Sequence, residues 1–323
     1  ILCLFLMSQF LSPAAAAPGD AASGGQERYI VGFRSGLRAQ DTSLLQSANA
    51  QVYRRLDRVR AVAARMSPQA AANLAAHPRV RYVEPDLKVP ALAQEVPWGI
   101  TRIGAPVIHD GGNDGSGVKV AVIDTGIDYT HPDLAGNYAG GYDFVNLDTD
   151  PMDDQGHGTH CAGTVAAVDN ADGVLGVAPG VSLYGLKMLD ASGEGELSDG
   201  IAALEWCVNN GVQVASMSWG AYDEPISQSF QDACADAYAS GVVLVAAAGN
   251  EGPGTNTVNQ PALYDSVIAV AAVDETDSWA FFSSTGPAVE VAAPGVSILS
   301  TWPGGEYETY EGTSMACPHV SGA

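Results

Sequence analysis

Three short segments of this 323-residue chain carry a carboxylate, an imidazole and a hydroxyl at positions where such groups do chemistry. Asp124 ends the largely apolar run 118–123, His157 opens the sequence His-Gly-Thr-His, and Ser314 lies within Gly-Thr-Ser-Met-Ala-Cys-Pro-His. A serine hydroxyl becomes a nucleophile when an imidazole takes its proton, and a carboxylate holds that imidazole in the required tautomer. The segments therefore predict acyl transfer, with Ser314 as the nucleophile, His157 as the base and Asp124 as the group that orients the base.

The order of these groups along the chain separates classes of enzyme. The order Asp, His, Ser is one of three in which this set of groups occurs. An esterase with an α/β-hydrolase fold needs a Gly-x-Ser-x-Gly elbow and the order Ser, Asp, His, and the chain has neither. A catalytically inactive binding protein would require one of the groups to be missing, and all of them are present. The sequence therefore favours a Ser-His-Asp enzyme in which the groups occur in the order Asp, His, Ser.

The distribution of charge divides the chain into two parts. Residues 21–92 hold eleven basic and five acidic residues, whereas residues 93–323 hold three basic and 31 acidic ones, so the net charges are +6 and −28. The acidic part would repel the phosphates of a nucleic acid, and we expect no nucleic-acid partner. Its many acids and few lysines fit a protein kept soluble at high salt, or an ordinary acidic secreted enzyme, and both interpretations stay open.

The first 17 residues are typical of a secretory signal. The apolar segment 1–7 leads to four alanines at 14–17, as the apolar core of a signal leads to a small-residue cleavage site. This segment is too short to span a bilayer, so we expect a secreted, extracellular protein without a stable membrane anchor. Because no initiator methionine or basic segment precedes it, we expect residues 1–17 to be an N-terminally incomplete signal peptide.

Residues 26–88 alternate between strand-like and helix-like segments. Helices are predicted at 40–49 and 68–76, the second with Ser67 as its cap and Pro68 in its first turn, and strands at 28–33, 51–53, 61–63 and 80–84. This order predicts a small ferredoxin-like α+β sheet. An independent binding domain is the alternative interpretation of this segment.

From residue 117 onward, continuous apolar strands alternate with helices. We expect helices at 157–167, 198–210 and 226–239, and strands at 118–123, 181–187, 212–218, 241–247 and 266–273. Apolar strands separated by helices predict an α/β fold, in which a parallel sheet carries helices on both faces and forms three layers. Catalytic groups of such sheets lie at the carboxyl ends of the strands, where Asp124 and Asn250 are expected.

The three motifs, taken in order, closely resemble those of the subtilisin-like serine proteases, and the resemblance covers nearly the whole chain. Within 26–88, the sequences Tyr-Ile-Val-Gly-Phe and Tyr-Val-Glu-Pro-Asp resemble the inhibitory propeptide of that family. The resemblance implies a subtilisin-like catalytic domain over 93–323, after a linker at 89–92 that leads to a processing site between Leu92 and Ala93. Because the domain of the family continues further, we expect this one to be C-terminally incomplete.

The resemblance implies a secreted serine endopeptidase that is made as an autoinhibited, self-processing precursor. Its partners would be protein or peptide substrates and its own propeptide, which would act as intramolecular chaperone and inhibitor, and we expect a monomer. Leu92 before the processing site implies a preference for large apolar side chains. Since a basic propeptide would face an acidic enzyme, charge should contribute to their association.

The resemblance also assigns residues around the scissile bond. Asn250, in Ala-Gly-Asn-Glu-Gly, would be the side-chain donor of the oxyanion hole, together with the backbone N–H of Ser314. An extended peptide would lie as a strand between two edge segments, where Trp219 stands at a position that is usually aliphatic in the family. The residues implied to bind substrate are Ser192, Gly193, Glu194, Ser218, Trp219, Gly220, Ala247, Ala248, Gly249 and Asn259.

Two acidic segments match calcium loops of the family. In the first, hard oxygen ligands for Ca²⁺ would come from the side chains of Gln94, Asp133 and Asn170 and from the backbone carbonyls of Val168, Asp172 and Val174. A solvated acidic turn is the alternative interpretation. The second segment, 143–150, resembles another calcium loop, and a site over 143–152 stays open.

Five cysteines occur in the chain, and Cys3 lies in the signal segment. Cys207 and Cys234 lie on predicted helices that flank one strand, and a disulfide between them, which secretion permits, stays open. Cys161 and Cys317 follow the His and Ser motifs, so we expect buried thiols close to the site. The spacing of the cysteines matches no zinc pattern.

Overall fold

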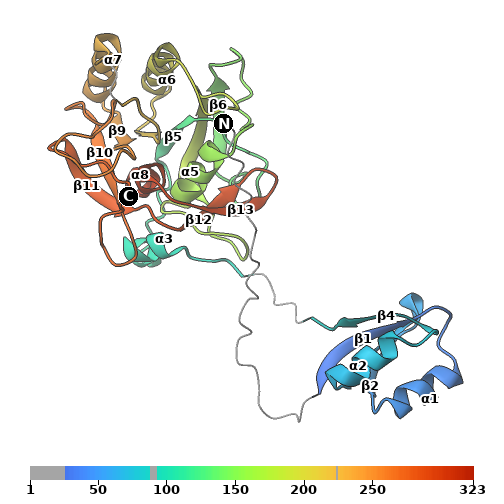
Figure 1. Ribbon diagram of the computed structural model, residues 1–323. Coiled ribbons are helices and arrows are strands. Elements are labelled where there is room, and N and C mark those ends of the chain that lie inside the picture. The colour runs from blue at the N-terminus through green and yellow to red at the C-terminus, as the bar shows by residue number, and fades with distance from the viewer. Residues whose placement is uncertain (1–25, 88–92, 223–224) are drawn as a thin grey trace, which may run out of the picture. The chain divides into compact units, whose positions relative to one another are not determined.

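The computed structural model describes residues 26–87, 93–222 and 225–323 in two compact units (Figure 1). The first unit spans residues up to Ala91 and the second runs from Leu92 to Ala323. The signal segment and the linker at 89–92 with Leu92 lie outside the described residues. Among the described residues, no helix has both the length and the apolar character needed to cross a membrane.

The first unit is a four-stranded antiparallel sheet in the order β2-β3-β1-β4. Side chains from alternate positions of β1 and β3, such as Val31 and Met66, form one core with Leu45 and Leu74 of the two helices, so both helices cover the same face. The order of elements confirms the predicted α+β arrangement. Its elements are β1 Glu27–Phe33, α1 Ala39–Ser47, β2 Gln51–Leu56, the 3-10 turn η1 Asp57–Val59, β3 Ala61–Met66, α2 Pro68–Ala75 and β4 Val80–Pro85.

The second unit is built on a seven-stranded sheet in the order β11-β10-β9-β8-β5-β7-β6, and every pair in it is parallel. This confirms the predicted α/β class. The strands are β5 Lys119–Asp124, β6 Tyr138–Asp143, β7 Ser182–Lys187, β8 Val214–Met217, β9 Val243–Ala247, β10 Ile268–Val273 and β11 Val289–Pro294.

Helices cover both faces of this sheet because its central strands are apolar on both sides. In β5, Val120 and Val122 pack with α5, whereas Ala121 and Ile123 pack in a core that α6 and α7 share. Figure 1 shows α8 on the same side as α5. The helices are α3 Trp98–Arg102, α4 Ala105–Asp110, α5 His157–Ala166, α6 Leu197–Asn210, α7 Gln228–Ala239 and α8 Thr313–Gly322, and the hairpin is β12 Ile298–Trp302 with β13 Glu306–Tyr310.

The predicted strands and long helices all occur, with ends that differ by a few residues, whereas both edge strands of the large sheet were missed. The strand β6 reads Tyr-Ala-Gly-Gly-Tyr-Asp and β11 reads Val-Glu-Val-Ala-Ala-Pro, and both are largely half-buried or exposed. An edge strand pairs on one side only, so it does not need the continuous apolar run by which the central strands were recognised.

Candidate active site

The three groups singled out by the sequence come from three different elements. Asp124 is the last residue of β5, His157 is the first residue of α5 and Ser314 is the second residue of α8. Strand β5 is central in the sheet, and α5 and α8 pack against each other. Residues that are distant in the sequence therefore meet at the carboxyl end of a central strand, as expected for such a sheet.

A buried carboxylate that the sequence analysis missed fixes the start of α5. Asp153 accepts hydrogen bonds from the backbone N–H groups of Gly156 and Thr159 at 2.8 and 2.9 Å, and from the hydroxyl of Thr125 at 2.9 Å. Gly156 has a φ of 117°, which other residues rarely adopt. Asp153 therefore ties the turn before His157 to the residue that follows Asp124.

Asp124 and His157 form a hydrogen-bonded pair, with Oδ1 and Nδ1 2.7 Å apart. The Asp124 side chain is fully buried, and its Oδ1 also accepts the backbone N–H of Thr125. Burial lowers the pKa of His157, but the negative charge of Asp124, together with the neighbouring Cys161 and the bond to Asp124, outweighs this effect, so the pKa lies well above 6.5. Since the His157 side chain is still 27% exposed, a substrate can reach the ring.

The hydroxyl of Ser314 donates to the backbone carbonyl of Ser218 at 2.9 Å, and in the described part of the chain no hydrogen bond joins it to His157. The two residues flank the same atom, since Cys161 Sγ lies 4.0 Å from Nδ1 of His157 and 3.5 Å from the carbonyl oxygen of Ser314. Nucleophile and base are often not in contact in a site without substrate. Rotation about χ1 of Ser314 would turn its hydroxyl away from the carbonyl of Ser218 and change which group it faces.

Asn250 follows β9 and is held by the start of α8. Its Oδ1 accepts hydrogen bonds from the backbone N–H and the hydroxyl of Thr313, both at 3.0 Å. Because the oxygen is occupied, the orientation of the amide is fixed and Nδ2 lies on the side of Gly312, next to the turn that carries Ser314. The arrangement leaves an N–H donor and the positive end of α8 on one side of the proposed nucleophile.

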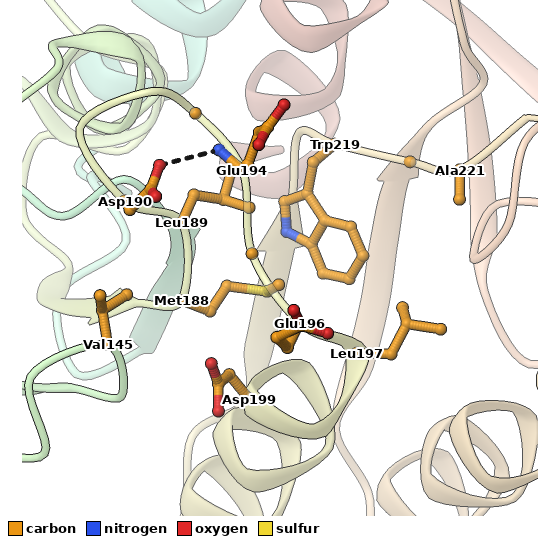
Figure 2. Close-up of a pocket in the computed structure, with 13 residues that line it drawn as sticks. Val145, Met188, Leu189, Asp190, Glu194, Glu196, Leu197, Asp199, Trp219 and Ala221 are labelled. Atoms are coloured by element: carbon orange, nitrogen blue, oxygen red, sulfur yellow. Dashed lines mark hydrogen bonds between the residues drawn. The ribbon is translucent and has the colours of Figure 1, made fainter.

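A cavity of about 720 Å³ lies between the segment after β7 and the segment after β8 (Figure 2). Of the residues implied to bind substrate, Gly193, Glu194, Trp219 and Gly220 line it, while Ser192, Ser218, Ala247, Ala248, Gly249 and Asn259 do not. The sequence analysis missed the apolar part of its wall. That part includes Val145, Met188, Leu189 and Leu197.

Two of the implied substrate residues that lie away from this cavity, Gly249 and Asn259, lie beside a carboxylate that the sequence analysis also missed. Glu251 accepts hydrogen bonds from Nδ2 of Asn259 at 3.2 Å and from the hydroxyl of Ser284 at 2.8 Å. Ala248 is fully buried, and Gly249 has a φ of 113° and no room for a side chain beside Glu251. Glu251 thus fixes how the Asn259 side chain lies beside Gly249, while the backbone N–H of Asn259 donates to the carbonyl of Ala248 at 2.9 Å.

The residues implied for Ca²⁺ gather around the side chain of Gln94. Its Nε2 donates to the carbonyls of Val168 and Val174 at 2.7 and 3.1 Å, and its Oε1 accepts the N–H of Asn170 at 3.3 Å. Asp133 accepts the side chain of Asn170 at 3.3 Å and the N–H of Val174 at 2.8 Å. With the Gln94 amide turned end for end, its oxygen would join the two carbonyls, so the donor set fits a hard cation.

Asp172 contributes to this loop through its N–H, which donates to the side-chain oxygen of Asn170 at 2.7 Å.

In the second acidic segment, 143–150, backbone N–H groups of the segment itself donate to its carboxylates. Asp143 accepts the N–H groups of Val145 and Asn146 at 2.8 and 2.9 Å, and Asp148 accepts that of Asp150 at 2.9 Å. These bonds do not decide whether a cation binds over 143–152, and that site stays open.

All four cysteines in the described part of the chain are buried free thiols, so Cys207 and Cys234 form no disulfide. Burial raises the pKa of both thiols to about 12. The two cysteines face one apolar core shared by α6 and α7, where neutral thiols pack as small apolar groups. Cys161 and Cys317 are buried beside the site, as expected.

Comparison with known proteins gives two family matches. The model of the subtilase family matches residues 115–323, and the model of peptidase inhibitor I9 matches residues 28–91. The chain is 45% identical to subtilisin E of Bacillus subtilis over 330 residues, which span 100% of the chain and 85% of that protein. It is 42% identical to an alkaline protease of Shouchella clausii over 333 residues, 99% of the chain and 85% of that protein. Against subtilisin of Bacillus pumilus, identity is 52% over 235 residues, 72% of the chain and 84% of that protein.

Proposed function

Because this chain belongs to the subtilase family and is a serine endopeptidase with a peptidase inhibitor I9 unit, we propose that Asp124, His157 and Ser314 are its catalytic triad. The observation that carries the proposal is the 2.7 Å bond between buried Asp124 and His157, next to a serine at the start of a helix. No other function is needed to account for this arrangement.

In the proposed reaction, Ser314 Oγ attacks the carbonyl carbon of the scissile peptide bond while His157 takes the hydroxyl proton. Asp124 holds the imidazole in the correct tautomer and stabilises its charged form. The oxyanion accepts hydrogen bonds from Nδ2 of Asn250 and from the backbone N–H of Ser314. His157 then protonates the leaving amine, which leaves an acyl-enzyme, and the same groups activate the water that hydrolyses it.

We assign the implied substrate residues to two surfaces. Gly193, Glu194, Trp219 and Gly220 would hold the extended part of the peptide at the cavity, with Ser192 and Ser218 beside them. Ala247, Ala248, Gly249 and Asn259 would wall the pocket for the side chain before the scissile bond. The hydrogen bond between Asn259 and Glu251 supports this pocket, because it fixes a polar group at its wall.

We propose that the chain is made as a secreted precursor in which 1–17 is a signal peptide, 26–88 an inhibitory propeptide and 93–323 the catalytic domain. Cleavage between Leu92 and Ala93 would release the active, monomeric enzyme. The I9 match supports an intramolecular inhibitor, and the opposite net charges of the two parts support their association. Protein or peptide substrates, rather than nucleic acid, would then bind to the acidic catalytic unit.

We also propose that the loop 168–174 binds Ca²⁺ together with Gln94 and Asp133. Residues Asn170, Val168, Asp172 and Val174 would complete the oxygen ligands. When bound, the ion would supply positive charge that holds this loop to the segment at Gln94. The bonds of Gln94 to the loop support this, because they bring the proposed ligands together.

One experiment tests the class of enzyme. The full-length protein is incubated with casein and calcium, with and without a serine-directed sulfonyl fluoride, beside the Ser314→Ala variant. We expect hydrolysis that the fluoride abolishes and that the variant lacks. Hydrolysis that persists in Ser314→Ala would overturn the assignment of the nucleophile.

A further inference from the structure

The side chain of Lys187 is a buried cation at a point where three segments of the proposed active site meet. Lys187 is the last residue of β7 and pairs in the sheet with Asp124, the last residue of β5. Only 2% of its side chain is exposed. Burying a charge costs free energy unless hydrogen bonds and an opposite charge compensate it. The partners of this ammonium group therefore decide what its burial achieves.

Three hydrogen bonds use all three protons of the ammonium group. Nζ donates to the backbone carbonyl of Thr125 at 2.8 Å, to that of Leu189 at 2.9 Å and to Oδ1 of Asp154 at 2.6 Å. Thr125 directly follows the proposed triad carboxylate, Leu189 lines the cavity (Figure 2), and Asp154 lies in the loop before α5. One side chain thus joins the turn after the carboxylate to the loop before the proposed base.

The two neighbouring acids of that loop hold the same turn through different groups. The carboxylate of Asp153 accepts the hydroxyl of Thr125 at 2.9 Å, whereas that of Asp154 is bonded to the ammonium group that holds the carbonyl of Thr125. Turn and loop also fit closely, because a Cβ at Gly126 would lie 2.5 Å from the carbonyl oxygen of Pro151. The ammonium group therefore adds a charged bond between two segments that are already in close contact.

The other lysine of residues 93–323 provides a contrast. Lys119 is the first residue of β5 and is partly exposed, and its Nζ donates to the backbone carbonyl of Asn210 at 2.8 Å. Water can therefore compensate the charge of Lys119, whereas Lys187 depends on its protein partners. A buried ammonium group with fixed partners leaves its segments little freedom, and Lys187 has this property at the end of the sheet where Asp124 lies.

We propose that Lys187 is a positioning residue for the reaction, which sets the place of Asp124 relative to His157 by joining the turn after Asp124 to the loop before His157. The proposal rests on the proposed function. Half of the Asp154 side chain is exposed, so this carboxylate compensates the buried ammonium group from the surface. Without the ammonium group, the turn and the loop lose their common partner, and the contact between Asp124 and His157 becomes less uniform.

Two variants and a control test this role. Lys187→Met removes the charge and all three donors from a side chain of similar length. Asp154→Ala removes only the carboxylate, and because Asp154 is half exposed this variant should fold even if Lys187→Met does not. Lys119→Met is the matched control, since it makes the same substitution at the opposite end of β5.

Each variant is compared with the parent on two substrates, and active sites are counted with a sulfonyl fluoride. One substrate is a small ester that occupies only the position of the scissile bond, and the other is a tetrapeptide anilide that extends along the cavity. A displaced triad slows the chemical step on both substrates. A change that acts only through Leu189 and the cavity would instead affect the anilide alone.

In Lys187→Met we expect kcat to fall by about tenfold to 100-fold on both substrates, with KM near that of the parent. In Asp154→Ala the fall should be about two- to tenfold, the range of one lost hydrogen bond. Lys119→Met should match the parent. Unchanged kcat in Lys187→Met, or in Asp154→Ala where Lys187→Met does not fold, would overturn the positioning role. A change confined to KM of the anilide would overturn it as well.

A second measurement does not depend on turnover. The proton between Asp124 and Nδ1 of His157 gives a downfield NMR resonance that reports on this hydrogen bond. We expect the resonance to shift upfield and broaden in Lys187→Met and Asp154→Ala, and to stay in place in Lys119→Met. A merely structural role would lower the melting temperature and leave the resonance unchanged.

The two measurements separate failure of the proposal from failure of the proposed function. A parent that hydrolyses neither the ester nor the anilide would contradict the proposed function alone. An unchanged resonance in both Lys187→Met and Asp154→Ala would overturn the positioning role whether or not the parent is active.

Discussion

The carboxylate of Asp124 lies 2.7 Å from Nδ1 of His157, and no part of the Asp124 side chain reaches solvent. A buried negative charge acts on its neighbour with little screening. The pair therefore holds the imidazole in place and favours its charged form, and both effects can be measured separately.

Removing the charge of Asp124 should change both the rate and the pH dependence. The base must be neutral to accept a proton, so kcat/KM should rise with pH through the pKa of His157, which lies well above 6.5 in the parent. In Asp124→Asn, the charge that most raises the pKa of His157 is lost, so this limb should move to lower pH, while kcat should fall about 10⁴-fold, as known for one such triad. Profiles of kcat/KM against pH test this; a limb that stays in place would contradict it.

Truncating Asn250 should reduce turnover without unfolding the protein. Asn250 is exposed, and its Nδ2 is the only side-chain donor that we assign to the oxyanion. We expect Asn250→Ala to lower kcat by about 100- to 1,000-fold, the loss known for this donor in a subtilisin, with little change in KM. The variant should remain folded, with a melting temperature somewhat below that of the parent because its two hydrogen bonds with Thr313 are lost. Near-normal kcat would remove Asn250 from the mechanism.

Calcium should stabilise the protein through Asp133. A chelator should lower the melting temperature of the parent, and Asp133→Asn should show a lower melting temperature that the chelator does not change further. Asp169→Asn is the control, since Asp169 lies in the same loop but is not among the proposed ligands. Equal chelator effects in Asp133→Asn and the parent would rule out this loop as the site.

Inhibition by the basic N-terminal unit should weaken as salt is added. The net charges of +6 and −28 attract, and screening shortens the range of that attraction from about 10 Å at 0.1 M salt to about 3 Å at 1 M. We expect the inhibition constant of a peptide of residues 26–92, added to processed enzyme, to rise by about tenfold over this range. Activity on an uncharged anilide at each salt concentration is the control, and a constant that stays the same would exclude a charge contribution.

The residues that we propose to carry the chemistry stand out in the sequence because each lies in a short motif at the end of a predicted strand or the start of a predicted helix. Asp124 ends a buried strand and His157 and Ser314 begin helices, so the sequence indicates both their chemistry and their place in the fold. The central strands were predictable for a different reason: a strand that is buried on both faces of the sheet requires an apolar run.

Supporting groups were not predictable, because their roles arise only from packing. Asp153 and Glu251 do not stand out among the many acids of this sequence, and only the fold shows that they accept several hydrogen bonds. The bonds from Lys187 to Thr125 and Asp154 likewise join residues whose proximity no local pattern indicates. The sequence also left a disulfide open between Cys207 and Cys234, although both thiols are free in the core.

Residues 93–323 contain only two lysines, and their places in the sheet differ in a useful way. Lys187 is buried, whereas Lys119 is partly exposed and is the first residue of β5, the strand that ends with Asp124. Amine-reactive electrophiles on a solid support would therefore attach the catalytic unit through Lys119 or its amino terminus. Attachment through Lys119 would leave the proposed triad at the opposite end of β5, where Asp124 lies, open to the surrounding solution.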